Sequence, residues 1–525
     1  MPTLNWIGKE AVVNHDKEVP FRLLKKVKAH SVGENSQNLI IHGDNLEALK
    51  ALMPYYQGKI KCIYIDPPYN TGNEGWVYND KVNSPKIKKW LGKVVGAEAE
   101  DLCRHDKWLC MMYPRLKLLR DLLSEDGVIF VSINDSEVHN LRFLLDEIFS
   151  ADNFIAQLVW ENREGGGSSD SRHFKIKHEY VLCYSTNKEL LFIKGVKIVD
   201  EERYSFEDKY VKERGRYQLV KLNSASIQYS KSLDYPINSP DGTEIVPSYD
   251  KKQACWRWSK EKLKWGIEND FVVIKKDNKE HWAVYTKQYL NVDNEGNIIE
   301  RTNRPFGVIS NFSSTMATKD LEKIFEKKVF DYSKPYLMLK FLFELSTNQD
   351  SLVLDSFAGS GTTAHAVLEL NKEDNGNRKF ILIELEDNVA KDITAERVKR
   401  AIQKYELKDG FEYCELDKPL FNEEGHIEEE CSFEQLANYI YFTETNTNLD
   451  KKTIDKQFIG DYNETEFYLL FKEKGKNTLN KDFLQKLNKN NKKKVLYADK
   501  CLIDEKTLEK NNLQFKQIPY EVKVY

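Results

Sequence analysis

A buried-strand pattern that ends directly in Asp66-Pro67-Pro68-Tyr69 constrains the fold most strongly. Residues 60–65 are almost all apolar, as a strand covered on both faces requires. Strands of this kind form parallel sheets, and such sheets bind ligands at the carboxyl ends of their strands. We therefore expect an α/β protein with a site beginning at residue 66.

Further strand patterns alternate with segments of helical spacing, which predicts a largely parallel sheet. These strands are expected at residues 39–42, 128–133, 179–185, 352–354 and 380–383. A segment rich in Lys, Trp and Tyr interrupts the alternation, and the composition changes again near residue 409. The predicted organisation is an α/β domain in two parts, 1–185 and 321–408, an inserted domain, 186–320, and a C-terminal domain, 409–525.

The tetrapeptide at 66–69 has the groups needed to hold an aromatic amine. The Asp66 carboxylate can accept one N–H of an exocyclic amine. Proline fixes φ and has no N–H, so Pro67-Pro68 forms a rigid turn in which the Pro67 carbonyl can accept the other N–H. Tyr69 offers a face on which a base flipped out of a duplex can stack. The alternative is a Pro-Pro turn in which the aspartate only caps a helix.

A second turn motif follows the strand expected at 352–354 and reads Asp355-Ser356-Phe357-Ala358-Gly359-Ser360-Gly361-Thr362. Its glycines let the backbone approach a ligand closely, and Thr362 can cap the next helix. The motif is neither G-x-G-x-x-G nor a lysine-containing phosphate loop, which disfavours NAD and ATP. Glu384, 23 residues beyond Gly361, can bind ribose hydroxyls. An ordinary strand-to-helix turn is the alternative.

These segments resemble the DNA amino-methyltransferases of the β order, in which the catalytic motif precedes the cofactor motif. The pattern is most similar to the modification (Mod) subunits of type III restriction-modification systems and covers most of residues 38–185 and 330–405. The resemblance also rests on Gly43 to Leu49, Trp108-Leu109, Pro114-Arg115-Leu116, Gly127 to Asp135, His178-Glu179-Tyr180, Lys334-Pro335 and Arg397. It implies a Rossmann-like methyltransferase with a mostly parallel, seven-stranded mixed sheet, a circularly permuted motif order, an inserted target-recognition domain and a C-terminal α+β addition.

The resemblance also implies a role for each matching residue. Asp66, Pro67, Pro68 and Tyr69 would hold the target amine and base. S-adenosylmethionine would be bound by Asp44, Lys334, Pro335, Asp355, Phe357, Ala358, Gly359, Gly361, Thr362 and Glu384, with Lys334-Pro335 beside the methionine moiety. Asp44 is equally suited to cap the helix that begins near Leu46, and Lys334 equally suits a solvated position before a proline-started helix. Ser356 departs from the family, which often has proline there.

The implied reaction is methylation of adenine N6 in duplex DNA. Related N4-cytosine enzymes usually carry serine in place of Asp66, which favours adenine. An N4-cytosine enzyme, a protein or RNA amino-methyltransferase, an orphan enzyme without a nuclease partner and a non-catalytic DNA-binding subunit remain alternatives. The resemblance further implies a homodimer and association with a restriction subunit that carries helicase and nuclease activities.

Two segments are expected to contact DNA. Arg163 and Arg172 flank a Gly/Ser-rich loop that could order on DNA, although a plain surface loop is the alternative. Trp256, Arg257 and Trp258 interleave aromatic and basic side chains, as base stacking and phosphate contact require. Tryptophans at this spacing are also typical of a core whose lysines lie on the solvated face.

Bulk properties exclude several classes of protein. The formal net charge of −4 decides nothing about DNA, because positive charge can be concentrated in one cleft. The 8 cysteines are scattered without a C-x-x-C pair, so neither a disulfide framework nor a metal site is expected. No apolar run reaches the length of about 18 residues needed to cross a membrane, and the start of the chain has no signal-peptide pattern. A cytoplasmic protein is expected.

Overall fold

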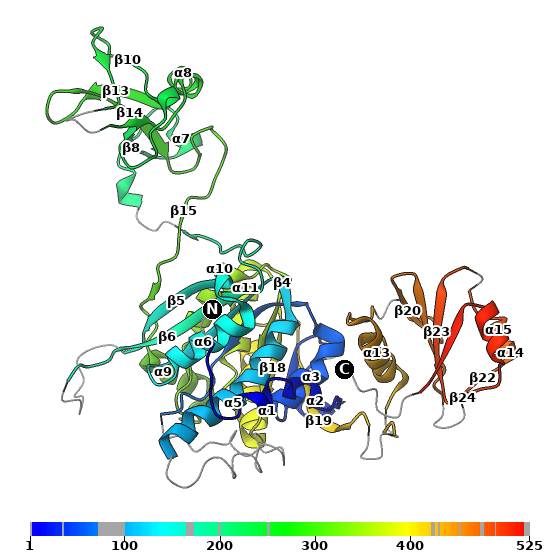
Figure 1. Cartoon of the computed structure of the whole chain (residues 1–525). Helices are drawn as coiled ribbons and strands as arrows, with labels where there is room; N and C mark the ends of the chain where they lie inside the picture. The colour runs from blue at the N-terminus through cyan, green and yellow to red at the C-terminus, as the bar shows by residue number, and fades with distance from the viewer. Residues whose placement is uncertain are drawn as a thin grey trace. The chain divides into compact units, whose positions relative to one another are not determined.

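The computed structural model describes residues 3–33, 36–71, 100–163, 173–197, 201–248, 253–421, 426–428, 431–450, 453–472, 477–488 and 490–518. The chain divides into two compact units: unit 1, Met1–Ile193 with Phe306–Tyr525, and unit 2, Lys194–Pro305 (Figure 1). Unit 2 is shorter than the predicted insert because residues 306–320 contribute strand β16 (Val308–Ile309) and the start of helix α9 (Ser314–Phe325) to unit 1.

A mixed sheet forms the centre of unit 1. Its order is β1 (Arg22–Lys26), β19 (Glu412–Pro419), β2 (Leu39–His42), β18 (Lys379–Glu384), β17 (Leu352–Asp355), β3 (Ile60–Ile65), β4 (Leu123–Ile133), β6 (His178–Ser185), β5 (Phe154–Glu161) and β16. The strands from β19 to β4 are parallel, whereas β6 runs antiparallel to both of its neighbours.

The sheet is larger than the predicted seven strands, with ten among the described residues. β1 and β19 extend one edge and β16 the other. Arg22–Lys26 contains only two apolar residues, and Val308–Ile309 is too short to form a pattern, so neither strand stands out in the sequence. β19 also lies beyond the predicted boundary at 408, yet it belongs to this sheet.

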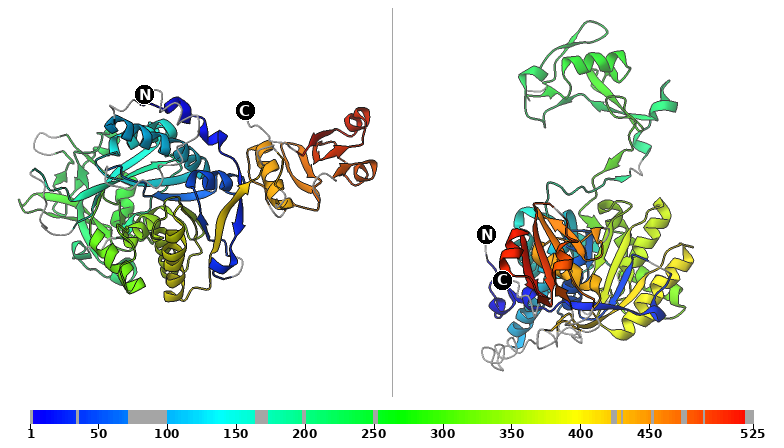
Figure 2. Two further views of the ribbon diagram at one scale, coloured as in Figure 1. Left: turned by 90° about the horizontal axis from the view of Figure 1, so that it is seen from below. Right: turned by 90° about the vertical axis from the view of Figure 1, so that its right-hand side faces the viewer.

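Helices cover both faces of the sheet because alternate strand residues point to opposite sides. Ile63 and Ile65 of β3 pack in one core with α3 (Asn45–Tyr56), α5 (Glu100–Leu122) and α6 (Val138–Phe149). Cys62 and Tyr64 of the same strand pack in a second core with α10 (Tyr336–Ser346), α11 (Thr362–Asp374) and α12 (Glu396–Lys404). The left view of Figure 2 shows blue and cyan helices on one face and yellow-green helices on the other. Both cores therefore fix β3, the strand that directly precedes Asp66.

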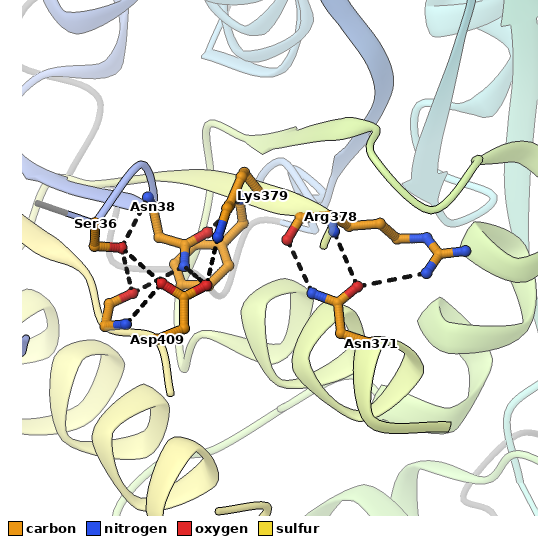
Figure 3. A network of polar contacts seen from close by, with 8 residues as sticks. Ser36, Asn38, Asn371, Arg378, Lys379 and Asp409 are labelled. Atoms are coloured by element: carbon orange, nitrogen blue, oxygen red, sulfur yellow. Dashed lines mark hydrogen bonds and ion pairs between the residues drawn. The ribbon is translucent and has the colours of Figure 1, made fainter. Parts of the chain in front are cut away.

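The amino ends of the central strands are closed by a paired polar network (Figure 3). Asp409 accepts hydrogen bonds from Ser36, Asn38 and Lys379, and the Lys379 Nζ lies 2.6 Å from its carboxylate. The Asn38 side chain also accepts the Phe380 backbone N–H at 3.0 Å. These partly buried groups and the buried Asn38 satisfy one another, so this end of the sheet has a structural role.

Unit 2 is a small β-rich domain. Its three-stranded antiparallel sheet has the order β13 (Val272–Lys276), β14 (Trp282–Tyr289) and β8 (Tyr217–Lys221), and α8 (Lys260–Glu268) accompanies it. Three two-stranded pairs complete the unit: β10 (Ile237–Asn238) with β11 (Glu244–Ile245), β12 (Cys255–Trp256) with β9 (Asn223–Ser224), and β15 (Thr302–Asn303) with β7 (Val196–Lys197).

The C-terminal segment combines a helix, α13 (Phe433–Thr445), with a second sheet. Its order is β20 (Phe458–Tyr462), β21 (Thr465–Leu469), β23 (Lys493–Ala498) and β25 (Leu513–Gln517). β20 and β21 are antiparallel and the remaining pairs are parallel. A short pair, β22 (Thr478–Leu479) with β24 (Lys500–Cys501), and helices α14 (Lys481–Leu484) and α15 (Glu505–Lys510) complete it. Across the described parts of the chain, the helices lack the combination of length and apolar character that a membrane span requires.

Candidate active site

The two sequence motifs meet at the carboxyl ends of adjacent parallel strands. β17 pairs with β3, so that Leu354 lies opposite Ile63. Asp66 follows β3 directly, Asp355 ends β17, and Glu384 ends the next strand, β18. The parallel register therefore brings together three carboxylates that are widely separated in the sequence.

The Asp66 carboxylate has one occupied and one unoccupied oxygen. Its Oδ2 accepts a hydrogen bond from the Lys334 Nζ at 2.8 Å, whereas its Oδ1 is buried and accepts none from the residues that the structure describes. The Lys334 ammonium also lies 3.8 Å from the Glu179 carboxylate and 4.8 Å from the centre of the Tyr69 ring. Lys334, expected beside a methionine moiety, thus contacts the motif at residues 66–69.

Hydrogen bonds hold the rest of the tetrapeptide. The Trp108 Nε1 donates to the Pro68 carbonyl at 2.7 Å, and the Tyr69 hydroxyl donates to Glu179 Oε2 at 3.0 Å. Asn162 Nδ2 donates to the other Glu179 oxygen at 2.7 Å. Burial and the nearby Asp66 carboxylate raise the pKa of Tyr69 well above its ordinary value, so the phenol stays neutral. The ring is thereby fixed with its hydroxyl anchored.

The second motif forms a tight glycine turn. Gly359 and Gly361 have φ of 49° and 78°, in the left-handed region that favours glycine. A Cβ on Gly361 would also lie 3.2 Å from the Thr394 carbonyl oxygen. The Gly359 N–H donates to Glu384 Oε2 at 2.8 Å, and Glu386 N–H donates to Oε1 at 3.0 Å. The turn and the acid at the end of β18 are therefore one assembly.

Two buried carboxyl groups titrate near neutrality. Burial raises the pKa of Asp355 to about 7, although Thr363 Oγ1 and the Phe357 N–H donate to it at 2.6 and 3.0 Å. Burial likewise raises the pKa of Glu384 to about 7. Strongly shifted carboxyl groups in a cavity are typical of functional sites.

The three carboxylates, Asp66, Asp355 and Glu384, border one cavity of about 1120 Å³ in unit 1. Pockets for small ligands usually measure roughly 300–1000 Å³, so this volume accommodates more than one ligand group. Of the predicted residues, the cavity is lined by Asp66, Pro67, Pro68, Tyr69, Arg163, Lys334, Asp355, Phe357, Ala358, Gly359, Thr362 and Glu384.

Three predicted cofactor residues are not among those that line the cavity. Asp44 is buried and caps α3, accepting the Leu46 N–H at 3.0 Å, and it pairs with Arg115 at 3.3 Å. It therefore has the capping role that the sequence left open. Pro335 is the N-cap residue of α10, and Gly361 is that of α11, where Thr362 had been expected to cap.

Several cavity residues were not among the predicted site residues. Glu179 comes from β6, Trp160 from β5, and Asn162 directly follows β5. Ser333, Ser360 and Tyr332 also line the cavity. Among these, Glu179 had a signal in the sequence, the His178-Glu179-Tyr180 pattern, because a charged residue beginning an apolar strand is unusual.

The residues predicted to contact DNA lie in different environments. Arg163 is exposed and borders the cavity, whereas Arg172 lies outside the described residues. Trp256 and Trp258 are only 1% and 7% exposed and belong to the core of unit 2, so the expected stacking surface is wrong for both. Trp256 Nε1 donates to the Tyr235 carbonyl at 2.6 Å, which satisfies its polar atom inside the core. Arg257, between them, is exposed.

Replacing Trp256 with alanine is expected to destabilise unit 2 by about 3–5 kcal/mol, because the change leaves a cavity in a packed core. Hydrogen exchange at the amides of β14 measures this loss locally in the full chain. Arg257→Ala, at the exposed neighbouring position, serves as the control and should leave β14 protection unchanged. Equal protection in Trp256→Ala and the wild type would show that the side chain is not part of the core.

Comparison with known proteins agrees with the geometry. The family model described as DNA methylase matches residues 60–396. The type III EcoPI Mod subunit of Escherichia phage P1 is 35% identical over 425 residues, covering 74% of this chain and 64% of that protein. The StyLTI Mod subunit of Salmonella typhimurium is 30% identical over 417 residues, covering 75% and 60%.

The type II methyltransferase M.KpnI of Klebsiella pneumoniae is 31% identical over 382 residues, covering 70% of this chain and 85% of that protein. The chain spans less than two thirds of the length of the two Mod subunits. The matched region runs from the strand that precedes Asp66 to the helix that follows Glu384, so it includes every carboxylate of the cavity. The mixed sheet with helices on both faces is that of a Rossmann-like methyltransferase, and the chain belongs to the DNA methylase family.

Proposed function

We propose that this chain transfers the methyl group of S-adenosylmethionine to N6 of an adenine flipped out of duplex DNA, as the modification subunit of a type III restriction-modification system. The observation that carries the proposal is the cavity in which Asp66, with one open acceptor oxygen, faces the same space as the glycine turn and Glu384. The part of the cavity beside Asp66 suits a planar amine, and the part beside the glycine turn and Glu384 suits a nucleoside.

The residues of the second motif fit S-adenosylmethionine. Glu384 is buried, held by two backbone N–H groups and suited to accept ribose hydroxyls. Phe357 and Asp355 provide the aromatic and acidic surroundings that a sulfonium favours. When bound, S-adenosylmethionine supplies a methyl group on its cationic sulfur.

The residues of the first motif fit the target base. Asp66 Oδ1 is a buried acceptor without a donor among the described residues, and leaving such an atom unpaired is costly. It would accept one N–H of the adenine amine, while the Pro67 carbonyl would accept the other. Tyr69, fixed through Glu179, would stack on the ring. Both acceptors favour an amine nitrogen whose lone pair is localised and free to attack.

Delivery of the base needs DNA contacts outside the catalytic motif. We assign target recognition to unit 2 and phosphate contact to Arg163 and Arg257, which are exposed basic residues. The strands β2, β18, β17, β3, β4, β6 and β5 would constitute the seven-stranded, circularly permuted methyltransferase sheet. The C-terminal segment would mediate dimerisation or contact with a restriction subunit.

Expression of the chain in a host without DNA methylation of its own tests this proposal. Sequencing of the host genome should reveal N6-methyladenine in a single short sequence context. Methylation of cytosine at N4 would instead indicate the alternative specificity, against which Asp66 argues. A genome without modified bases would contradict the proposed function.

A further inference from the structure

Glu137 is a fully buried carboxylate in the turn between β4 and α6. Its Oε1 accepts a hydrogen bond from Asn70 Nδ2 and lies 2.5 Å from His105 Nδ1, and its Oε2 accepts one from Asn140 Nδ2 at 2.8 Å. An ionised carboxylate can only accept, so the His105 ring nitrogen is the donor in this pair. Among the described residues, neither a lysine nor an arginine lies at ion-pair distance from Glu137.

The carboxylate does not have the ordinary role of a polar side chain at the start of a helix. Glu137 is the N-cap residue of α6, where such a side chain usually accepts a backbone N–H of the first helical turn. Within the described part of the chain, the Glu137 carboxylate accepts no such N–H and binds Asn70 and His105 instead. A buried carboxylate is costly unless hydrogen bonds offset its desolvation, so these contacts determine where it lies.

Asn70 directly follows Tyr69 and has an unusual backbone conformation. Its φ of 57° lies in the left-handed region, which residues other than glycine seldom adopt, although asparagine tolerates it better than most. The residue is completely buried, and its side-chain amide donates to Glu137. This bond ties the left-handed residue to the start of α6 and so fixes the direction in which the chain leaves Tyr69.

Helix α5 holds the same turn at a second point. Trp108 lies three residues after His105, so both side chains lie on one face of α5. The Trp108 Nε1 donates to the Pro68 carbonyl, and His105 contacts Glu137, which holds Asn70. Asn70, His105 and Glu137 are not among the residues that line the cavity, so they support the turn from outside it.

We infer that Glu137 is a positioning residue for the base-binding half of the site, which it fixes through Asn70. The inference rests on the proposed function, because the turn at residues 66–69 carries the groups proposed to hold the target adenine. Methyl transfer needs these groups aligned with the amine, and a displacement of about 1 Å can lower a rate roughly 100-fold. Glu384 and the glycine turn bind each other on neighbouring strands, so cofactor binding should not depend on Glu137.

An exchange of the two partners tests this inference. Asn70→Asp places a second carboxylate against Glu137 and should lower the single-turnover rate of methyl transfer, at saturating cofactor and DNA, by roughly 100-fold. Glu137→Gln replaces charge-assisted hydrogen bonds by neutral ones and should lower the rate by about tenfold. In the double variant, the amide introduced at position 137 can donate to the carboxylate introduced at position 70. Its rate should therefore recover to within about tenfold of the wild type.

Each rate is divided by the number of cofactor sites, measured by calorimetric titration with S-adenosylhomocysteine, so that loss of folded protein does not lower it. The affinity for this ligand should stay within about twofold in all three variants. Asn38→Asp is the matched control, because the Nδ2 of the equally buried Asn38 donates to the Asp409 carboxylate at 3.1 Å, at the amino ends of the strands (Figure 3). Its rate per site should equal that of the wild type.

A double variant slower than either single variant would overturn the inference, as would a wild-type rate per site in Asn70→Asp. If Asn70→Asp yields no cofactor sites, Glu137→Gln decides, and an unchanged rate there would likewise overturn it. A wild type that binds S-adenosylhomocysteine but transfers no methyl group to DNA would contradict the proposed function, and the inference with it.

Discussion

Asp66→Ala is expected to lower the rate of methyl transfer to DNA by roughly 1000-fold, within the range observed when one preorganised polar group is removed from a transition-state site. The loss follows because Oδ1 is the buried acceptor offered to the target amine. Binding of S-adenosylmethionine should persist, since the glycine turn and Glu384 do not depend on Asp66. Single-turnover kinetics and calorimetry on the same preparation separate the two effects.

Asp126→Ala provides the matched control for this variant. Asp126 also accepts a hydrogen bond from a lysine, Lys61, at 2.7 Å, close to the 2.8 Å between Asp66 and Lys334. Its side chain is 48% exposed and does not line the cavity, so loss of this ion pair should leave turnover unchanged. Near-normal turnover in Asp66→Ala would mean that the amine is held by other groups.

Glu384→Gln is expected to weaken binding of S-adenosylhomocysteine by roughly 100-fold at pH 8, because hydrogen bonds from two ribose hydroxyls to a charged group would be replaced by weaker ones. The effect should depend on pH. The pKa of Glu384 is raised to about 7, so the carboxylate is protonated below neutrality. Affinity of the wild type should therefore rise from pH 6 to pH 8, and this rise should be smaller in Glu384→Gln.

The same raised pKa has an opposite consequence for the stability of the ligand-free protein. Folded Glu384 keeps its proton between pH 4.5, its ordinary pKa, and about 7, whereas the unfolded chain has released it. The free energy of unfolding should therefore fall as pH rises through this window. Asp355 contributes in the same direction, since its pKa is also raised to about 7.

Asp355→Asn distinguishes the pH dependence of affinity that comes from Glu384 from any that comes from Asp355. This variant should retain the pH-dependent affinity that comes from Glu384, because Asp355 is already bonded to Thr363 and to the Phe357 N–H. Affinity titrations at pH 6, 7 and 8 on both variants provide the comparison. An unchanged pH dependence in Glu384→Gln would exclude its carboxylate from cofactor binding.

The sequence predicts the catalytic half of the sheet well because its strands are buried on both faces. Residues 39–42 and 60–65 form β2 and β3 with the expected bounds, and the residues after β3 line the cavity as expected. A continuous apolar run suits burial on both faces, so it marks a central strand of a parallel sheet. The edge strands lack this signal, since three of the five residues of Arg22–Lys26 are charged.

The roles that the sequence did not predict depend on contacts between distant segments. Arg397 appears in a helix rich in charge, where a solvated arginine is the ordinary expectation, yet it is buried against hydroxyls from two other segments. A π-helix, Val389–Ala395, leads into α12, and the hydroxyl of its Thr394 donates to the Gly359 carbonyl in the glycine turn at 2.6 Å. Trp256 and Trp258 show the converse, because their spacing with basic residues resembles an interface although they form a core.

Transfer of labelled methyl from S-adenosylmethionine to unmethylated duplex DNA, followed by analysis of the nucleosides, tests the central claim most directly. Asp66 and Tyr69 beside the glycine turn predict that the label appears in N6-methyladenine. Label in N4-methylcytosine, or DNA that remains unlabelled in the presence of bound cofactor, would contradict the account.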